Sequence, residues 1–250
     1  MDMTGNTILV TGATSGIGRA LAEAFHQAGN TVIVAGRRAA LLQEVAAENP
    51  GMTTMEFDVE DAAGIAGFAA RLVAAQPRLN VLINNAGIMR AEDLLAEDYA
   101  TDDAEAMIAT NLLGPIRLTM ALLPQLRAQT KAAVLNISSG LAFVPMSQTP
   151  TYSATKAALH SWSQSLRHQL RATSVEVIEL APPAVATDLM PNWRNNPHAM
   201  KLDDYIAQTM ALLEENPQAA EICVPPVRRL REAERKGNYD TIFAMLNPAG

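Results

Sequence analysis

The chain has 250 residues, with 19 lysines and arginines against 26 aspartates and glutamates, so its formal net charge is -7. This acidic balance argues against a general nucleic-acid binder or a protein of anionic membrane surfaces. The single cysteine, Cys223, excludes an intrachain disulfide framework and a cysteine-rich zinc site. One cysteine suits a reducing compartment, so we expect a cytoplasmic protein. No apolar run reaches the roughly 20 residues that span a bilayer, so we expect no membrane partner. The acidic charge leads us to expect no nucleic-acid partner.

Short apolar runs rich in valine and isoleucine alternate along the chain with longer amphipathic segments. Strands this apolar are typical of a parallel sheet that helices cover on both faces. We therefore predict an α/β fold, with one Rossmann-like, doubly wound parallel sheet of six or seven strands in a single domain over residues 1–250. The expected strands are residues 7–10, 31–35, 52–57, 81–83, 133–137 and 175–180, with helical segments such as 19–28 and 105–129 between them.

A glycine-rich turn directly follows the first expected strand and leads into a helical segment. Glycines let the backbone approach a pyrophosphate closely, and the amides and dipole of a helix N-terminus hold its negative charge. The ending Gly-Lys-Ser/Thr of a P-loop is missing, so the context favours a dinucleotide. In the run Thr-Gly-Ala-Thr-Ser-Gly-Ile-Gly, which starts at Thr11, the expected contacts are Gly12, Thr14, Ser15, Gly16, Ile17 and Gly18.

The end of the second expected strand indicates which dinucleotide binds. A carboxylate there would bind an unphosphorylated ribose, whereas an arginine would accept a 2′-phosphate. The chain has Arg37 and Arg38 at this point and no acidic residue. We predict that Arg37, with help from Arg38 and the hydroxyls of Thr14 and Ser15, selects NADP(H) over NAD(H). The alternative is a solvated basic turn.

Tyr152 and Lys156 stand four residues apart, downstream of Ser138 and Ser139. On a helix such a pair shares one face, so the Lys156 ammonium would favour the ionised form of the Tyr152 phenol. A phenol whose pKa is otherwise near 10 would then be usable as an acid or base near neutral pH. The spacing alone is weak, because average composition gives it by chance in roughly one of every two chains of this length.

Taken in order, these motifs resemble the short-chain dehydrogenase/reductase family over residues 4–188. The resemblance implies that Asp58 and Val59 contact the adenine. It also implies that Asn85, Ala86 and Gly87, within an Asn-Asn-Ala-Gly motif, bind the cofactor at the end of a strand. The cofactor part would cover about residues 1–135 and the catalytic part about 136–250.

The same resemblance implies a catalytic tetrad. Tyr152 would be the general acid in carbonyl reduction and the base in alcohol oxidation, while Lys156 would lower its pKa and bind the nicotinamide ribose. Ser139 would hydrogen-bond the substrate oxygen, and Asn111 would hold a water that links Lys156 to solvent. The 13 positions between Ser139 and Tyr152 match the usual family spacing, although the sequence alone does not separate Ser139 from Ser138.

The segment after the sixth expected strand departs from the family pattern. Pro183 stands where the family commonly has glycine, and because proline lacks an N–H we expect a slightly different backbone beside the nicotinamide. Pro182, Val185 and Thr187 keep their expected cofactor contacts, with Thr187 at the carboxamide. Residues 182–201 are either a lid or an ordinary surface loop. The proline pair and residues 237–247 resemble the bacterial DltE-like branch of the family.

The C-terminal part carries weaker signals. No seventh strand is evident, residues 227–236 are typical of a charged helix, and residues 241–246 form a short apolar tail. We expect a homo-oligomer, either a dimer or a tetramer. A basic cluster is interleaved with glutamates, which favours a solvated face without function; its members are Arg228, Arg229, Arg231, Arg235 and Lys236. 

The histidines show no metal-ligand spacing with carboxylates or cysteine, so we expect no metal site; they are His26, His160, His168 and His198. Apolar side chains are expected to border the substrate end of the cleft and suggest a partly apolar substrate, although core or lid packing explains them equally well; they are Phe143, Met146, Met190 and Trp193.

The expected function is NADP(H)-dependent hydride transfer to or from a small carbonyl or alcohol substrate. A nucleotide-sensing regulatory protein without turnover is the alternative, but it predicts a broken tetrad. An epimerase or dehydratase of nucleotide sugars would have a longer chain and a different glycine spacing.

Overall fold

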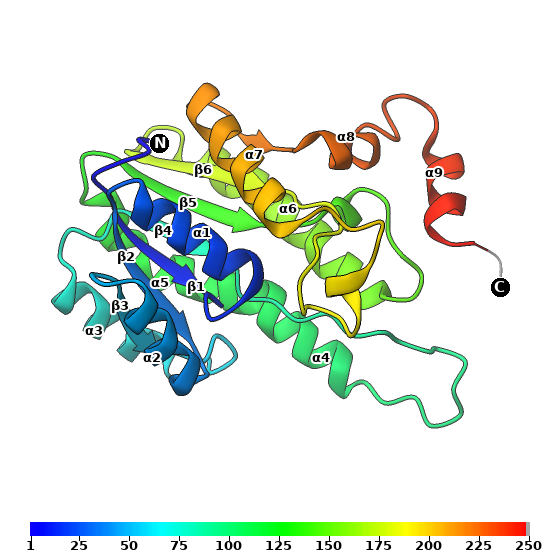
Figure 1. The fold of residues 1–250 in the computed structure, drawn as a ribbon, viewed down its shortest axis with the longest axis horizontal. Helices are drawn as coiled ribbons and strands as arrows, with labels where there is room; N and C mark the ends of the chain where they lie inside the picture. The colour runs from blue at the N-terminus through cyan, green and yellow to red at the C-terminus, as the bar shows by residue number, and fades with distance from the viewer. Residues whose placement is uncertain (249–250) are drawn as a thin grey trace.

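A computed structural model describes residues 1–248, in which seven parallel strands form one sheet covered by helices on both faces (Figure 1). The strands lie in the order β3-β2-β1-β4-β5-β6-β7. The predicted fold class is therefore confirmed. The strands are β1 (Thr7–Thr11), β2 (Thr31–Gly36), β3 (Thr53–Glu56), β4 (Val81–Asn84), β5 (Ala132–Ile137), β6 (Val175–Leu180) and β7 (Glu221–Ile222).

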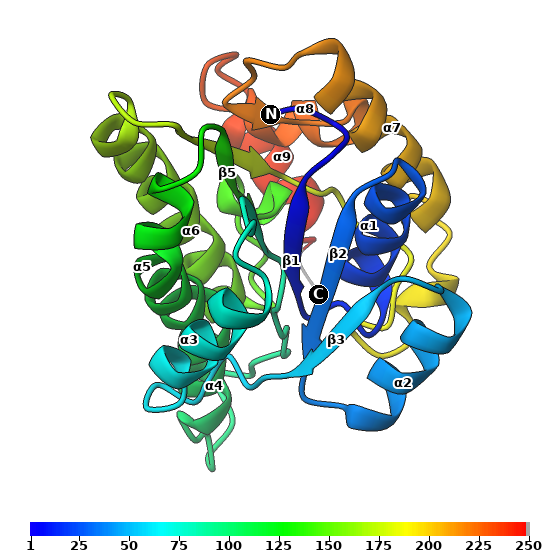
Figure 2. The same cartoon turned by 90° about the vertical axis from the view of Figure 1, so that its left-hand side faces the viewer.

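Two helical layers enclose the sheet, with α1, α2 and α7 on one face and α3, α5 and α6 on the other (Figure 2). Alternate residues of a strand point to opposite faces, and β1 shows the result. Ile8 and Val10 pack into the core under the first layer, while Leu9 packs under the second. The helices are α1 (Gly16–Gln27), α2 (Ala39–Glu48), α3 (Ile65–Ala75), α4 (Asp102–Ile108), α5 (Gly114–Arg127), α6 (Pro150–Leu170), α7 (Leu202–Glu215), α8 (Pro225–Arg231) and α9 (Tyr239–Leu246).

The seventh strand, β7, settles a point that the sequence left open. Its two residues, Glu221 and Ile222, pair in parallel with Glu179 and Leu180 at the end of β6. A strand of two residues is too short to show an alternating pattern, which is why it has no sequence signal. The expected charged helix over 227–236 is shorter and begins earlier, as α8, because a proline at its first turn suits helix initiation.

Helices α4 and α5 form one continuous helix, joined by a π-helical turn, η1 (Ala109–Leu113). By length and composition this helix, Asp102–Arg127, could cross a membrane, in contrast to the expectation from the sequence. In its most apolar window 44% is buried within the protein, and Leu118, Leu122 and Leu126 pack into the core. The long helix thus supplies one wall of the domain interior.

Candidate active site

A cavity of about 980 Å³ opens at the carboxyl ends of the central strands. The strand order reverses between β1 and β4, and open α/β sheets bind their ligands in the crevice at such a point. All of the predicted site residues line this cavity except Asp58 and Asn111. Segments distant in the sequence therefore meet where the motifs predicted a dinucleotide site.

The glycine turn after β1 lies so close to the segment after β4 that side chains would not be accommodated. A Cβ on Gly12 would lie 2.6 Å from the Cα of Ala86, and Gly12 also has a φ of 63°, which favours glycine. A Cβ on Gly18 would lie 2.1 Å from Nδ2 of Asn85. That amide donates to the carbonyls of Thr11 and Gly12 at 3.0 and 3.2 Å. Asn85 thus fixes the shape of the turn.

The two arginines after β2 have different surroundings. The guanidinium of Arg38 donates to the Thr14 hydroxyl at 3.2 Å and to the Ser15 hydroxyl at 2.8 Å. Arg37 instead donates to Glu60 at 3.2 Å and lies 3.8 Å from Asp58. The expected partnership of Thr14 and Ser15 is therefore with Arg38, because the Arg37 side chain forms ion pairs with acidic residues.

Asp58 and Val59 were expected to act as a pair at the adenine. Val59 lines the cavity, whereas Asp58 does not. The Asp58 carboxylate accepts a hydrogen bond from the backbone N–H of Glu60 at 3.0 Å and faces Arg37. Its position indicates an electrostatic role on Arg37 and on the turn after β3.

Tyr152 and Lys156 lie on α6, as their spacing predicts, and both are buried, at 6% and 4% exposure. Lys156 Nζ donates to the carbonyl of Ile137 at 2.8 Å and lies 5.5 Å from the centroid of the Tyr152 ring. Burial raises the pKa of Tyr152 to about 12, although a hydrogen bond with Ser139 offsets part of the rise. The expected net lowering of this pKa is therefore not found: desolvation dominates, and the lowering contribution comes from Ser139.

Lys156 carries the opposite shift. Burial disfavours its charged form and lowers its pKa to about 8, while the nearby carboxylate of Glu179 raises it. Glu179 is itself fully buried on β6. A lysine in this state exchanges its proton near neutral pH, and the neighbouring carboxylate limits the loss of charge.

The two serines at the end of β5 are separated by the structure. Both line the cavity. The Ser139 hydroxyl accepts the backbone N–H of Leu141 at 3.1 Å and interacts with Tyr152, whereas Ser138 donates to the carbonyl of Leu180 at 3.5 Å. Of the two serines, Ser139 is therefore the one whose hydroxyl contacts the Tyr152 phenol.

Asn111 lies in the π-helical turn and is fully buried. Its Oδ1 accepts the N–H of Ile88 at 2.8 Å, and its Nδ2 donates to the Ile88 carbonyl at 2.8 Å and to Thr155 at 3.3 Å. The side chain thus anchors the segment after β4 to the helices behind it. Both Nδ2 donors are engaged and Oδ1 accepts one hydrogen bond, so the side chain has a positioning role beyond the predicted one.

The segment after β6 closes the cavity opposite the glycine turn. Pro182, Pro183, Val185 and Thr187 all line it, and the methyl group of Thr187 lies 3.5 Å from where a Cβ on Gly16 would stand. The Pro182 carbonyl accepts the N–H of Gly140 at 2.8 Å, a contact that does not involve Pro183. The proline pair is thus accommodated without loss of this backbone hydrogen bond.

The substrate end of the cavity is formed partly by segments that sequence reasoning did not assign. Of the expected apolar residues, Met146 and Trp193 line it, but Phe143 and Met190 do not. Phe143 instead packs edge-on against the His160 ring, with centroids 5.0 Å apart. Residues from α8 and α9 complete the lining, including Arg229 and Leu246. The sequence marked these two segments only as a basic cluster and a short apolar tail, with no site assigned to either, and Arg229 is the member of the cluster that lines the cavity.

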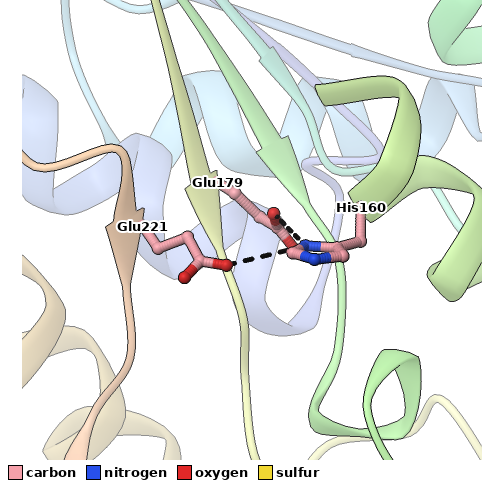
Figure 3. Close-up of side chains that lie close together, drawn as sticks. All are labelled: His160, Glu179 and Glu221. Carbon is pink, nitrogen blue, oxygen red and sulfur yellow. Dashed lines mark hydrogen bonds and ion pairs between the residues drawn. The ribbon is translucent and has the colours of Figure 1, made fainter. Parts of the chain in front are cut away.

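His160 from α6 meets Glu179 from β6 and Glu221 from β7 (Figure 3). Its Nδ1 lies 2.7 Å from Glu179 and 3.6 Å from Glu221, and its Nε2 lies 2.8 Å from the Gln164 amide. With that amide donating to Nε2, the Nδ1–H donates to Glu179.

The histidines show no metal-ligand spacing in the sequence, yet the structure groups His160 with two carboxylates. Within residues 1–248 the ligand atoms of His160, Glu179 and Glu221 lie within 4.8 Å of one another, in a group that could hold a metal ion. Only pairing of β7 with β6 brings Glu221 to this place, so sequence spacing could not reveal it. Arg231 also pairs with Glu221 at 2.9 Å, and the group joins α6, β6, β7 and α8.

Comparisons with known proteins agree with this geometry. Residues 6–198 match the family model of the short chain dehydrogenases. The uncharacterized oxidoreductase DltE of Bacillus subtilis (strain 168) is 40% identical over 253 residues, which cover 99% of this chain and 98% of that protein. The NADP-dependent 3-hydroxy acid dehydrogenase YdfG of Shigella flexneri is 33% identical over 210 residues, 84% of each chain.

A solved structure supports the same relationship. A short chain dehydrogenase from Burkholderia cenocepacia J2315 in complex with NADP superimposes with a TM-score of 0.83 at 25% identity, covering 98% of this chain and 99% of that one. The family resemblance drawn from the motifs, including its DltE-like branch, is confirmed.

Proposed function

The chain belongs to the short-chain dehydrogenase/reductase family, and we propose that it is an NADP(H)-dependent oxidoreductase that transfers a hydride between nicotinamide and a carbonyl or secondary alcohol. The observation that carries the proposal is the convergence of Ser139, Tyr152 and Lys156 on one wall of the cavity whose other end is the glycine turn.

The residues present suit a dinucleotide. Side chains at Gly12 and Gly18 would collide with Ala86 and Asn85. The turn leads into the N-terminus of α1, where backbone amides can hold a pyrophosphate. The cofactor would supply the hydride, and the family relatives include proteins whose names carry NADP. We propose that Arg38, fixed by Thr14 and Ser15, holds the 2′-phosphate, with Arg37 as its neighbour.

In the proposed reduction, Tyr152 donates its phenolic proton to the substrate oxygen while the carbonyl carbon accepts the hydride. Its raised pKa, about 12, keeps the phenol protonated at neutral pH, which is the form that an acid catalyst needs. Ser139 hydrogen-bonds the same oxygen and stabilises its developing negative charge. Lys156 then donates a proton to the tyrosinate that remains, and a proton from solvent restores the ammonium of Lys156.

The DltE-like and YdfG-like relatives suggest oxidoreductase chemistry on small molecules, and the name of YdfG specifies 3-hydroxy acids. We propose a small carbonyl or alcohol substrate, partly apolar, because Met146, Leu189 and Trp193 line the end of the cavity beyond Tyr152. A regulatory nucleotide sensor remains the competing function, and no residue contact favours it.

We further propose that the protein is a cytoplasmic, single-domain homo-oligomer. Support comes from apolar side chains exposed on the long helix, where Ile108, Leu113 and Met120 are 40%, 36% and 57% exposed. Light scattering would report the mass in solution, and one cooperative thermal transition is expected of a single domain.

The test of function is a screen of ketones, aldehydes and alcohols with NADPH, NADH and their oxidised forms, followed at 340 nm. Turnover with a higher kcat/KM for NADPH than for NADH supports the proposal. Tight NADPH binding without turnover on any compound would instead favour the regulatory sensor, and a preference for NADH would refute the assignment of Arg38.

A further inference from the structure

Arg229 is the member of the basic cluster that lines the cavity. It lies on α8, exposed to solvent, and makes no salt bridge with a carboxylate among residues 1–248. Its neighbours are engaged elsewhere: Arg231 pairs with Glu221, while Arg235 and Lys236 pair with Glu232. Arg229 is therefore the member of the cluster that both lines the cavity and has no carboxylate partner among residues 1–248.

Close packing fixes α8 beside the proposed catalytic serine. Gly140, the residue after Ser139, has no Cβ, and one placed there would lie 2.7 Å from Val227 and 2.8 Å from Leu230. Both of those side chains are buried on α8. Arg229 stands between them in sequence, so its backbone is held next to the turn that carries Ser139.

The other charged side chains that line the cavity make polar contacts of their own, and the lining also includes His198. Asp188, the acidic residue in the lining, is bonded to Arg194, and Arg90 lies 3.8 Å from Asp103. The remaining wall is largely apolar and includes Leu189, Trp193 and others. A guanidinium at the edge of an apolar pocket selects a planar anionic group by paired hydrogen bonds.

We propose, on the basis of the proposed function, that Arg229 binds a carboxylate of the substrate and that the enzyme acts on oxo acids or hydroxy acids in preference to neutral carbonyl compounds. Arg229 is separated from Arg38 by the width of the sheet, because Arg38 follows β2 and α8 follows β7. It is therefore a substrate residue, distinct from the proposed phosphate site.

The chain supplies both a control and a reporter. Arg228 is the matched control, since it has the same charge on the same helix but bonds the Cys223 carbonyl at 3.3 Å and does not line the cavity. Trp193 lines the cavity and is one of two tryptophans. In a Trp162→Phe background, its fluorescence reports occupancy of the substrate end whether or not turnover follows.

The experiment titrates the NADP-loaded protein with pyruvate, acetoacetate and 4-oxopentanoate, and with the ethyl ester of each, and follows Trp193 fluorescence. The same six compounds are then tested as substrates with NADPH in steady-state kinetics. At least one acid should bind more tightly than its ester. Arg229→Gln should weaken that acid about tenfold or more, mainly through KM, and leave the ester and the Kd of NADPH unchanged. Arg228→Gln should behave as the parent protein, and thermal melting checks that both variants fold.

Each outcome has a separate meaning. The inference is overturned if no acid is preferred over its ester, or if Arg229→Gln keeps the preference. Turnover of neutral ketones with no effect of Arg229 would leave the proposed function standing without the carboxylate site. Acid binding that depends on Arg229, with no NADPH oxidation, would establish an anion site and overturn the proposed function.

Discussion

Lys156 Nζ donates its hydrogen bond to the carbonyl of Ile137, at 2.8 Å, and lies 5.5 Å from the centroid of the Tyr152 ring. The lysine is thus tied to the end of β5, the strand that leads to Ser139. This bond places the ammonium between the sheet and the tyrosine. The side chain is consequently held in place by the fold, before any ligand binds.

Tyr152→Phe should abolish the proposed proton transfer and little else. We expect kcat to fall by about 100-fold to 10,000-fold, the usual contribution of a positioned acid, while the Kd of NADPH changes little. Stopped-flow or steady-state absorbance at 340 nm measures kcat, and NADPH fluorescence measures the Kd. Near-normal turnover by this variant would refute the role of Tyr152.

The two serines provide a matched pair. Ser139→Ala should lower kcat strongly, because it removes the hydroxyl that interacts with Tyr152, whereas Ser138→Ala should lower it much less. Loss of one donor to a developing oxyanion typically costs about 100-fold to 1,000-fold in kcat. Equal losses in both variants, with unchanged melting temperatures, would show that the contacts do not separate them.

NADPH binding should depend on the protonation of Lys156. Its pKa, lowered to about 8, means that the free enzyme loses the ammonium as the pH rises through 8. If Lys156 contacts the nicotinamide ribose in its charged form, affinity is full below pH 8 and weakens above it. Tyr152 and Cys223, with pKa values raised to about 12 and about 11, do not titrate in that window.

The measurement is NADPH fluorescence between pH 6.5 and 9.5. Lys156→Met should bind more weakly at pH 7 and lose the inflection. A parent protein whose Kd stays constant over this range, or a Lys156→Met variant that keeps the inflection, would contradict the assignment.

The arginines after β2 should differ in their effect on cofactor choice. Arg38→Gln is expected to weaken NADPH about tenfold or more and leave NADH nearly unchanged, because a charged contact to the 2′-phosphate is lost. Arg37→Gln should have the smaller effect, since its guanidinium pairs with Glu60 and Asp58. Ratios of kcat/KM for the two cofactors decide between them, and a larger effect of Arg37→Gln would restore the assignment made from sequence.

Gly140→Ala should destabilise the protein by about 1–3 kcal/mol, the usual cost of overpacking. The new Cβ would press on the buried Val227 and Leu230 and displace α8. Gly67→Ala is the control, since its Cβ would meet only Arg71 at 3.6 Å within α3. The melting temperature should fall for Gly140→Ala and should not fall for Gly67→Ala. Equal melting temperatures for the two variants would show that α8 shifts to accommodate the new methyl group without strain.

The fold was predictable because buried parallel strands carry their signal in composition. Short apolar runs, most of them rich in valine and isoleucine, located six strands. In contrast, β7 has only Glu221 and Ile222 and depends on its pairing with β6. The π-helical turn at Asn111 was equally hidden, since no sequence pattern distinguishes a single π-helical turn from the α-helix on either side of it. The other strands could thus be predicted from local sequence patterns, whereas β7 and the π-helical turn depend on contacts between distant parts of the chain.

The site was predictable where chemistry repeats in a fixed order. The glycine turn and the Tyr152-Lys156 pair lie at the cavity as expected. The sequence could not predict which partners the side chains that follow a strand would contact. Arg37 and Arg38 are adjacent, and their partners depend on where Glu60 and Thr14 lie in space. The shift of the Tyr152 pKa likewise depends on burial, which neither spacing nor motif reveals.

The tail of the chain is physically joined to the substrate end of the cavity. Asn247 donates to the carbonyl of Pro145 at 3.1 Å, and Leu246 lies in the cavity wall. The glycine turn, Tyr152 and Lys156 all precede this part. Exchanges in α8 and α9 can therefore reshape the substrate end of the cavity, while the glycine turn, Tyr152 and Lys156 keep their places.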